Sequence, residues 1–230
     1  MVAVVLGGGA GNRFGAAMPK QLLTLGGKTL IEHCVTAFRQ APGIDDVLLV
    51  MPPSYLEEAA KLVGDQVSAI ITGGVSRSDS VRNALDHLAA SEVAGTTTAV
   101  LLHDAARPLV TRRIIADCVT ALSEHDAIGT AVPTSDTIVV AENGVMSHVP
   151  PRETLHRCQT PQCFRLSVIA EAHKLAADDP GFTPTDDCGV VLRYLPDVPV
   201  HIVGGSERNI KVTYPGDLAI AEALLSTAED

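Results

Sequence analysis

Glycines and two basic residues lie together directly after the first apolar run of the chain. Residues 7–15 are Gly-Gly-Gly-Ala-Gly-Asn-Arg-Phe-Gly, and Pro19-Lys20 follows them. Because glycine has no side chain, the backbone N–H groups of such a segment can approach an anion closely, and Arg13 and Lys20 add positive charge. The segment therefore predicts a phosphate-binding loop, with a merely flexible turn as the alternative.

The spacing of these residues excludes two well-known phosphate loops. The dinucleotide fingerprint G-x-G-x-x-G fails because Asn12 or Phe14 stands where its third glycine would be. A Walker A loop ending in Gly27-Lys28-Thr29 fails because Leu22 occupies the place of its first glycine.

Two further polar clusters follow later apolar runs. Residues 72–80 contain Gly73, Gly74, Arg77 and Ser80 just before a stretch with helical spacing. Glycines, a cation and hydroxyls at the start of a helix suit the recognition of an anion or a base. The alternative is an ordinary helix cap formed by Asp79 or Ser80.

The second of these clusters is His103-Asp104-Ala105-Ala106-Arg107-Pro108. A carboxylate at the end of a buried strand, beside bound phosphates, is suited to holding Mg²⁺, so Asp104 is the candidate metal ligand. Arg107 could bind a second phosphate through two parallel hydrogen bonds. The alternative is a surface turn that Asp104 caps and in which Arg107 pairs with it.

The second half of the chain carries more scattered polar residues. They are Asp136-Thr137, Pro151-Arg152, Gln159-Thr160-Pro161-Gln162, Thr185-Asp186-Asp187 and Arg208–Thr213. Lys211 lies between Ile210 and Val212, and in a strand it would face opposite to both, although a surface lysine is equally compatible. The histidines and the five scattered cysteines show no metal-ligand spacing, and the cysteines favour reduced thiols in the cytoplasm.

Short apolar runs alternate with stretches of helical spacing along the chain. The predicted strands are residues 2–6, 46–51, 68–72, 98–103, 127–132 and 199–203; the predicted helices are 29–39, 54–63, 79–89, 111–122, 166–177 and 215–225. This alternation predicts one α/β domain over residues 1–230, with a mostly parallel sheet covered by helices on both faces. Ligands of such sheets bind at the carboxyl ends of the strands, where the clusters above begin.

One segment interrupts the alternation. Asn143-Gly144 separates two short strand-like runs, and this dipeptide is the strongest short signal for a β-hairpin. We therefore expect a projecting hairpin arm at about residues 136–157.

Composition limits the partners of the protein. The 230 residues are 46% hydrophobic and 3% aromatic and carry a formal net charge of −10. Such an acidic, aromatic-poor chain is not suited to coating nucleic acid or binding an anionic membrane, and no apolar run reaches transmembrane length.

Taken in order from about residue 2 to residue 225, these motifs resemble the CTP-dependent cytidylyltransferases that act on polyol phosphates. The resemblance implies a Rossmann-like nucleotidyltransferase fold, Mg²⁺ bound by Asp104, and a homodimer joined through the arm. It implies transfer of CMP from CTP to a polyol phosphate with release of pyrophosphate. Because a phosphate monoester is already largely ionised near neutral pH, this reaction requires no nucleophile–base pair, and none stands out in the sequence.

The resemblance also implies the roles of individual residues. CTP would be bound by Gly7, Gly8, Gly9, Gly11, Arg13, Lys20, Gly74, Ser80, Asp104 and Ala105. The acceptor would be bound by Arg107, Asp136, Thr137, Arg152, Thr185 and Lys211. The cations at the reacting centre would be Arg13, Lys20, Arg152 and Lys211.

The acceptor itself stays open between two members of the group. The 2-C-methyl-D-erythritol 4-phosphate enzymes are favoured, and ribitol 5-phosphate is the alternative because Gly7-Gly8-Gly9 is closer to the opening of the ribitol enzymes. A nucleotide-binding regulator without turnover is a further alternative. A dinucleotide-dependent oxidoreductase is disfavoured, since Met51-Pro52-Pro53 replaces the acidic end of its second strand.

Overall fold

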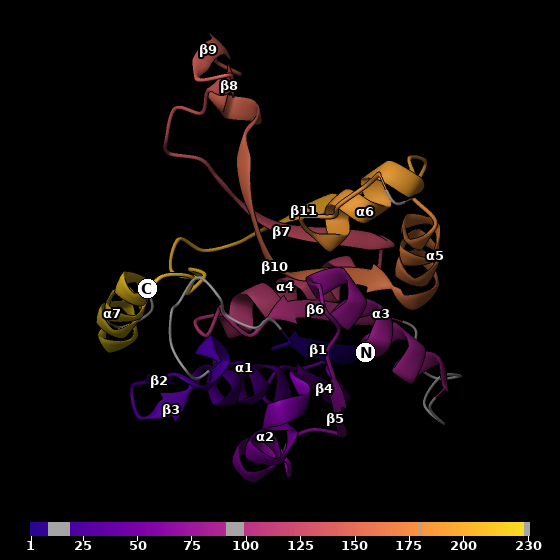
Figure 1. Cartoon of the computed structure of the whole chain (residues 1–230), viewed down its shortest axis with the longest axis vertical. Coiled ribbons are helices and arrows are strands. Elements are labelled where there is room, and N and C mark those ends of the chain that lie inside the picture. Colours follow the sequence, from indigo (N-terminus) through magenta and orange to yellow (C-terminus); the bar gives the residue numbers. More distant parts are fainter. Residues whose placement is uncertain (9–18, 91–98, 180, 228–230) are drawn as a thin grey trace.

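A seven-stranded sheet forms the centre of the protein (Figure 1). The computed structural model describes residues 1–8, 19–90, 99–179 and 181–227. The strand order is β11-β7-β10-β6-β1-β4-β5. The bounds are β1 Val2–Leu6, β4 Asp46–Met51, β5 Ala69–Thr72, β6 Ala99–Asp104, β7 Ala127–Pro133, β10 His156–Arg165 and β11 His201–Gly204. All neighbouring pairs are parallel except the two that β10 makes, so the predicted fold class is confirmed.

Strand β1 is apolar along its whole length because both faces of the sheet are covered. Ala3 and Val5 of β1 face one core cluster, and Val4 and Leu6 face the other. The first cluster is covered by α1 Leu30–Arg39, α2 Leu56–Val63 and α4 Arg112–Ala121. The second is covered by α3 Arg77–Ala90, α5 Leu166–Ala177 and α6 Asp187–Tyr194.

A third, smaller cluster joins the last helix to a short hairpin. In it Ala221 of α7, Pro215–Ser226, packs with Leu25, Leu30 and Val212. Leu25 belongs to β2, Thr24–Leu25, which pairs with β3, Lys28–Thr29. Because Val212 belongs to this cluster, the segment before α7 lies toward the middle of the molecule.

Strand β10 and helix α6 were not predicted from the sequence. The polar Gln159, Thr160 and Gln162 and the intervening Pro161 interrupt the apolar pattern of β10, and the β10–β7 register shifts between Cys158 and Gln162. The strand is nevertheless buried over most of its length because it lies between β6 and β7. Helix α6 has only eight residues, too few for a clear helical period.

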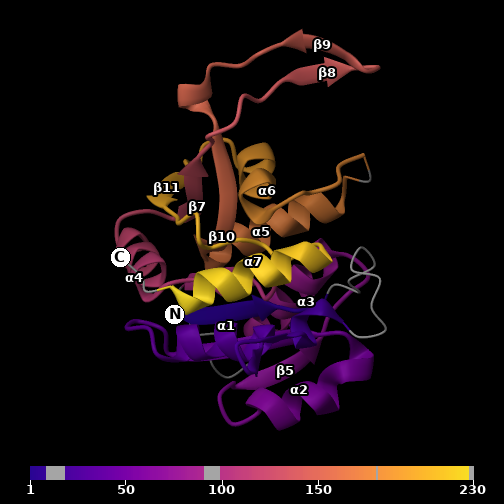
Figure 2. The same ribbon diagram turned by 90° about the vertical axis from the view of Figure 1, so that its left-hand side faces the viewer.

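The predicted hairpin is confirmed. Its strands are β8 Val140–Glu142 and β9 Val145–His148, and Asn143 and Gly144 have φ angles of 51° and 79°. The arm stands away from the rest of the molecule, beyond the ends of β7 and β10 (Figures 1 and 2). The arm ends slightly before the expected residue 157, because His156 already pairs with β7.

Within the described ranges, none of the helices combines the length and the apolar composition that crossing a membrane requires.

Candidate functional site

Asp104 lies at the carboxyl end of β6, next to the end of β1. Its Oδ1 accepts a hydrogen bond from Nε of Arg77 at 3.0 Å, and its Oδ2 accepts one from Nζ of Lys211 at 2.6 Å. Burial alone would raise the pKa of Asp104, but the charges of Arg77 and Lys211 outweigh it and hold the pKa well below its usual range. The carboxylate is therefore ionised at any ordinary pH.

Arg77 links Asp104 to a second buried carboxylate. Its Nη2 lies 2.8 Å from Oδ2 of Asp187, and Oδ1 of Asp187 lies 3.0 Å from Nε2 of His173. The four side chains in this series of contacts come from β6, α3, α6 and α5, so three helices and a strand meet behind Asp104. Burial opposes ionisation of Asp187, but Arg77 and His173 outweigh it and lower its pKa.

A buried histidine fixes the turn that follows β6. Thr160 Oγ1 accepts a hydrogen bond from the Asp104 amide at 3.1 Å, so its hydroxyl proton is directed to Nδ1 of His103, 3.0 Å away. Nε2 of His103 then donates to the carbonyl of Arg107 at 3.1 Å. Burial lowers the pKa of His103 to about 4, so the ring is neutral and structural, as the sequence indicated.

Arg107 does not pair with Asp104, so the alternative of a surface pair is wrong. Its Nη1 donates to the carbonyl of Asn209 at 2.8 Å and its Nη2 to the carbonyl of Cys158 at 3.3 Å. The Asn209 side chain in turn donates to the carbonyl of Thr160 at 2.9 Å. These bonds hold the loop before α7 against β10 and keep the guanidinium at the end of the sheet.

The segment around Lys211 has no regular secondary structure, so the strand-like pattern does not correspond to a strand. The alternation of its side chains is nevertheless present: Val212 is buried in the third cluster, whereas Lys211 turns to Asp104. The Val212 amide donates to the carbonyl of Ala106 at 2.8 Å, and Lys20 Nζ donates to the carbonyl of Val212 at 3.0 Å. The backbone of this segment thus brings Lys20 and Lys211 to the same place.

Two pockets meet at Asp104. The first pocket has a volume of about 220 Å³ and is lined by Gly7, Gly8, Lys20, Ser80, Asp104 and Ala105, all predicted to bind CTP. The second pocket has a volume of about 230 Å³ and is lined by Asp104 and by Arg107, Thr185 and Lys211, predicted to bind the acceptor. Arg77, Asp104 and Lys211 line both pockets. A larger hollow of about 360 Å³, beside Thr36 and Leu109, contains none of the predicted site residues.

Glycine is required where two loops of the first pocket touch. A Cβ on Gly8 would lie 2.6 Å from Oγ of Ser80, and one on Gly73 would lie 2.9 Å from Cα of Gly8. The Ser80 hydroxyl accepts from the Gly74 amide at 3.0 Å. Gly74 therefore acts by holding Ser80, and the close approach brings the loop after β5 against the loop after β1.

The cap of α3 differs from the one expected. The helix begins at Arg77, and Ser76 rather than Asp79 or Ser80 precedes it. The Ser76 hydroxyl accepts from the Asp79 amide at 3.1 Å, and the Asp79 carboxylate accepts from the Ser76 amide at 2.8 Å. This reciprocal pair leaves Ser80 free to line the first pocket.

Of the remaining predicted site residues, some lie outside the described residues and others line neither pocket. Gly9, Gly11 and Arg13 lie outside the described residues. Asp136, Thr137 and Arg152 are exposed at the base of the arm and line neither pocket, and Arg152 Nη1 donates to the carbonyl of Ser135 at 3.3 Å.

Several residues of the site were not predicted from the sequence. The sequence indicates Arg77 as one of the cations beside the predicted site loops, but not its contacts with Asp104 and Asp187. Asp187 and Gln162 lie within polar segments that were noticed, but no pattern distinguishes them there from their neighbours. His173 lies in a helix, and no local signal separates it from the other histidines.

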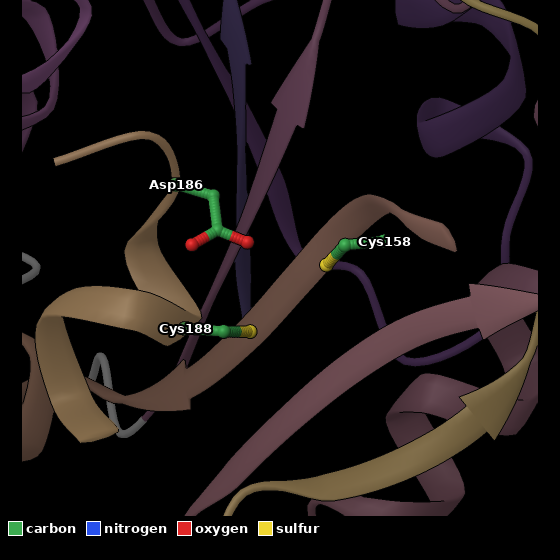
Figure 3. A group of neighbouring side chains, drawn as sticks. All are labelled: Cys158, Asp186 and Cys188. Carbon is green, nitrogen blue, oxygen red and sulfur yellow. The ribbon is translucent and has the colours of Figure 1, made fainter. Parts of the chain in front are cut away.

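Cysteines that are scattered in the sequence meet in space. Cys158, Asp186 and Cys188 lie together, and the first two line the second pocket (Figure 3). None of the five cysteines forms a disulfide. Folding brings together residues 30 positions apart, which spacing rules for metal ligands do not cover.

The donor set at the pockets is suited to binding a hard cation together with phosphates. Asp104 offers an ionised carboxylate where both pockets meet, and Mg²⁺ is commonly held by one such carboxylate plus phosphate oxygens. Lys20, Arg77, Arg107 and Lys211 supply positive charge around it. The arrangement can therefore bind two phosphorylated molecules side by side.

Comparisons with known proteins agree on one family. Residues 1–227 match the family model described as 2-C-methyl-D-erythritol 4-phosphate cytidylyltransferase. The enzyme of that name from Thermobifida fusca is 52% identical over 99% of this chain and 94% of its own length. A bifunctional ribulose 5-phosphate reductase/CDP-ribitol pyrophosphorylase from Haemophilus influenzae is 37% identical over 98% of this chain and 48% of its own length.

Solved structures share the fold. The 2-C-methyl-D-erythritol 4-phosphate cytidylyltransferase of Thermus thermophilus superposes with a TM-score of 0.76 at 32% identity, covering 99% of this chain and 98% of that one. A 4-diphosphocytidyl-2C-methyl-D-erythritol synthase from Anaerococcus prevotii reaches a TM-score of 0.86 at 22% identity, covering 98% and 96%.

Proposed function

The chain belongs to the 2-C-methyl-D-erythritol 4-phosphate cytidylyltransferase family, and we propose that its two joined pockets carry out that family's reaction. It is a nucleotidyltransferase that transfers CMP from CTP to 2-C-methyl-D-erythritol 4-phosphate and releases pyrophosphate. The observation that supports this assignment best is that Arg77, Asp104 and Lys211 line both pockets. Two phosphorylated substrates bound there would meet at these three side chains.

CTP occupies the first pocket in this proposal. The backbone at Gly7 and Gly8 and the Lys20 ammonium take the triphosphate, together with Gly9, Gly11 and Arg13 of the same glycine loop. Ser80 and Ala105 lie against the cytosine, and Gly74 supports Ser80 through its 3.0 Å hydrogen bond.

The acceptor phosphate occupies the second pocket. Arg107 is fixed there by the carbonyls of Asn209 and Cys158, so its guanidinium is oriented before the substrate arrives. Thr185 offers a hydroxyl, and Lys211 lies between this pocket and the first one. A fixed set of donors of this kind positions the attacking oxygen next to the CTP phosphates.

The chemistry requires charge stabilisation rather than proton removal. An oxygen of the acceptor phosphate bonds to the α-phosphorus of CTP, and the bond from that phosphorus to the pyrophosphate breaks. The acceptor phosphate has a second pKa near 6, so it is largely dianionic at neutral pH and no side chain has to deprotonate it. Lys20 and Lys211 stabilise the negative charge that spreads over the phosphoryl oxygens.

Magnesium is part of the proposal through one residue. Asp104 would hold Mg²⁺, which supplies further positive charge to the phosphate oxygens when bound. Because Arg77 keeps Asp104 ionised and oriented, the carboxylate is ready for that role.

We also propose a homodimer joined through the arm. Val145 and Met146 are 69% and 60% exposed, and Ile138, Val139 and Val149 are exposed beside them. An isolated arm with this apolar surface is suited to packing against a second copy. Asp136, Thr137 and Arg152 stand away from the pockets of their own chain, so they would reach an acceptor only across such a dimer.

The preferred acceptor follows from the relatives. The identity of 52% to the Thermobifida fusca enzyme exceeds the 37% to the CDP-ribitol enzyme, which favours 2-C-methyl-D-erythritol 4-phosphate over ribitol 5-phosphate. A silent regulator would need only the first pocket, whereas this chain also has the cations of the second. Five free thiols fit a reducing compartment, so we place the reaction in the cytoplasm.

Pyrophosphate release with CTP, Mg²⁺ and each acceptor tests the function. We expect turnover with 2-C-methyl-D-erythritol 4-phosphate and at least tenfold lower kcat/KM with ribitol 5-phosphate, which corresponds to about 1.4 kcal/mol. Equal or higher kcat/KM with ribitol 5-phosphate would reverse the choice of acceptor. Tight CTP binding without release for either acceptor would favour the regulator.

Lys211→Ala tests the roles assigned inside the site. We expect kcat to fall about 10²–10³-fold, as for the loss of one charge-stabilising donor, with a much smaller change in CTP affinity. Lys28→Ala is the control, because Lys28 lies on β3 away from both pockets. Equal losses in kcat and CTP affinity, or little loss in either, would refute this role of Lys211.

A further inference from the structure

Two thiols and a carboxylate converge at the edge of the second pocket. Cys158 lies on β10 just before its register shift, Asp186 caps α6, and Cys188 is the second residue of that helix. The two sulfur atoms and a carboxylate oxygen all lie within 4.8 Å of one another (Figure 3). From this cluster we propose that Cys158, Cys188 and Asp186 form a binding site for one thiophilic divalent cation, of which Zn²⁺ is the representative.

The dimensions of the cluster suit four-coordinate zinc. Sulfur lies about 2.3 Å and carboxylate oxygen about 2.0–2.2 Å from Zn²⁺, so the ligand atoms of one tetrahedral ion are about 3.4–3.8 Å apart. The three ligand atoms lie within 4.8 Å of one another, so binding of one ion would draw them closer together. Sulfur ligands favour Zn²⁺ over Mg²⁺, which distinguishes this site from Asp104.

The cluster can supply a thiolate, the form of cysteine that binds metal. Binding of a divalent cation would favour deprotonation of Cys158. The charge of a bound cation would favour deprotonation of Cys188 as well. Cys158 is exposed, so an ion can reach the site from solvent.

Gln162 holds two of the three ligands in place. Its Nε2 donates to Sγ of Cys158 at 3.0 Å and to Oδ2 of Asp186 at 2.9 Å. Its Oε1 accepts from the amides of Asp187 and Cys188 at 2.9 and 3.1 Å, which fixes the orientation of its amide group. Asp186 Oδ1 also accepts from the Gly189 amide at 2.8 Å. Metal ligands are commonly oriented by outer hydrogen bonds of this type.

The protein offers three ligands, and the fourth position of the ion faces the second pocket. Cys158 and Asp186 both line that pocket, whereas Cys188 is buried behind them. An open position of this kind takes water or an anion. Phosphate is the anion suited to it, because Arg107 and Lys211 line the same pocket.

Cobalt binding to the full chain tests the site, because thiolate ligands give Co²⁺ an intense near-ultraviolet charge-transfer absorption. The protein is reduced with a phosphine, freed of metal by a chelator and titrated with Co²⁺ and then with Zn²⁺. We expect one ion per chain, a tetrahedral Co²⁺ spectrum and its loss when Zn²⁺ displaces the cobalt. Absence of this absorption, with all five thiols shown to be reduced, would overturn the proposal.

Four variants identify the ligands. We expect Cys158→Ala and Cys188→Ala each to halve the charge-transfer absorption and to lower affinity by more than the 10–100-fold expected for loss of an outer partner. Asp186→Asn keeps the helix cap and should retain the absorption at lower affinity. The control Cys118→Ala removes a buried thiol that neighbours Cys163 instead, and it should bind as the parent does. Equal loss in this control would place the ion elsewhere and contradict the assignment.

Inorganic phosphate tests the open fourth position without relying on catalysis. Added to the Co²⁺ form, it should change the visible bands of the metal, because an oxygen ligand exchanges at the ion. An unchanged spectrum at saturating phosphate would show that the ion has no position open to the second pocket.

Discussion

Arg77 is the residue on which the ionised state of the site depends most directly. It contacts Asp104 at one end of its guanidinium and Asp187 at the other, at 3.0 and 2.8 Å. Only a planar, forked cation can bridge two carboxylates in this way, and lysine has a single charged nitrogen. The orientation of Asp104 therefore depends on helix α3, which also carries Ser80 into the first pocket.

The substitution Arg77→Lys should leave a side chain that cannot bridge Asp104 and Asp187. We expect the free energy of unfolding to fall by about 2–3 kcal/mol, less than the 3–5 kcal/mol for a fully buried pair because the Arg77 side chain is 28% exposed. Urea unfolding measures the change, and kcat should fall as well because Asp104 loses its fixed orientation. The matched control is Arg82→Lys on the same helix, whose surface pair with Asp79 should be worth less than about 1 kcal/mol. Equal effects of the two substitutions would contradict a special role for Arg77.

Residue types and spacing predicted the residues that line the pockets better than the residues that support them. Gly7, Gly8, Lys20, Asp104 and Arg107 follow strand ends, and parallel strands bring their carboxyl ends to one edge of the sheet. Asp187 contacts Arg77, and His173 contacts Asp187, although both lie about a hundred residues from Arg77 in the sequence. That contact arises from the packing of α3, α5 and α6, which no local pattern encodes.

At the scale of elements, β10 shows why a buried strand can look polar. Gln159 and Gln162 are buried, yet their amide groups are bonded to Ser206, Asn209, Asp186, Asp187 and Cys188. A buried polar side chain is tolerated when its hydrogen bonds are satisfied. The apolar helices and parallel strands follow periodicity and were predicted, whereas β10 depends on partners that only the fold supplies.

The arm gives a prediction about assembly. Gly144 has a φ of 79° in the hairpin turn, and a Cβ there would meet nothing within 4 Å. Gly144→Ala should therefore strain only the backbone, by about 1–2 kcal/mol, because an L-residue is disfavoured at positive φ. If the arm forms the dimer, its dissociation constant should rise about 5–30-fold, measured by sedimentation velocity over a range of concentrations.

Gly27→Ala is the matched control for that experiment. Gly27 has a φ of 85°, is equally open and lies between β2 and β3, away from the arm. Its substitution should impose similar backbone strain and leave the dissociation constant unchanged. A chain that is monomeric at all concentrations, or a dimer weakened equally by both substitutions, would refute the arm as the dimer contact.

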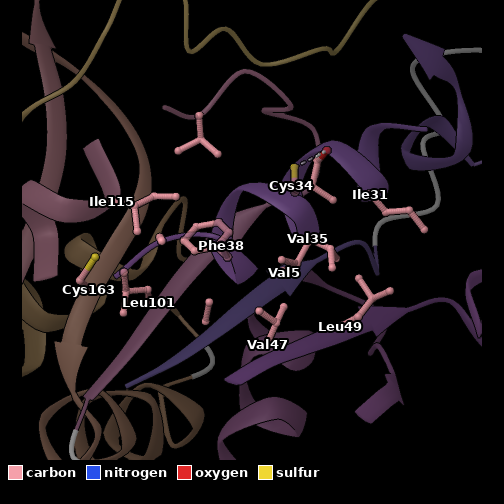
Figure 4. Packing of buried hydrophobic residues seen from close by; sticks show 14 of the residues in the cluster. Val5, Ile31, Cys34, Val35, Phe38, Val47, Leu49, Leu101, Ile115 and Cys163 are labelled. Atoms are coloured by element: carbon pink, nitrogen blue, oxygen red, sulfur yellow. Dashed lines mark hydrogen bonds between the residues drawn. The ribbon is translucent and has the colours of Figure 1, made fainter. Parts of the chain in front are cut away.

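At the scale of the whole molecule, the hydrophobic core directly supports the site. Phe38, Val35 and Cys34 of α1 pack over β1 and β4 in the first core cluster (Figure 4). The Cys34 thiol donates to the carbonyl of Ala105 at 3.6 Å, and the Phe38 ring meets His103 edge-on at 5.1 Å. The turn that carries Asp104 therefore rests directly on buried side chains.

The buried His103 makes the stability of the molecule depend on pH. Its pKa is about 4 in the folded chain and 6.5 as the ordinary value, so between these values the unfolded chain binds more protons. The contribution is fully present above pH 6.5 and is lost as the pH falls toward 4. The difference between the two pKa values of His103 corresponds to about 3 kcal/mol of unfolding free energy.

Urea unfolding at pH 7 and pH 4.5 measures this effect. Compared with His103→Gln, the parent chain should lose about 2–3 kcal/mol more on acidification. His87→Gln, at an exposed position of α3, should lose as much as the parent. If His103→Gln shows the same loss as the parent, His103 does not cause the dependence.

Net charge disfavours nucleic acid and anionic membranes as partners but does not give the location of the charge. The chain carries −10 overall, yet Lys20, Arg77, Arg107 and Lys211 line the two pockets. Acidic residues such as Glu57 and Glu58 are exposed on α2, remote from the pockets. Composition describes the average surface, whereas the folded chain determines the local field that anionic substrates meet.

The antiparallel strand in the middle of the sheet has a consequence for biosynthesis. Strands β5, β4, β1 and β6 can pair once residue 104 has left the ribosome, but β7 is joined to β6 only through β10. The edge of β6 that pairs with β10 stays unpaired until about sixty more residues have been synthesised. At 5–20 residues per second this takes about 3–12 s. During that interval the nascent chain exposes an unpaired strand edge of the kind to which another chain can pair.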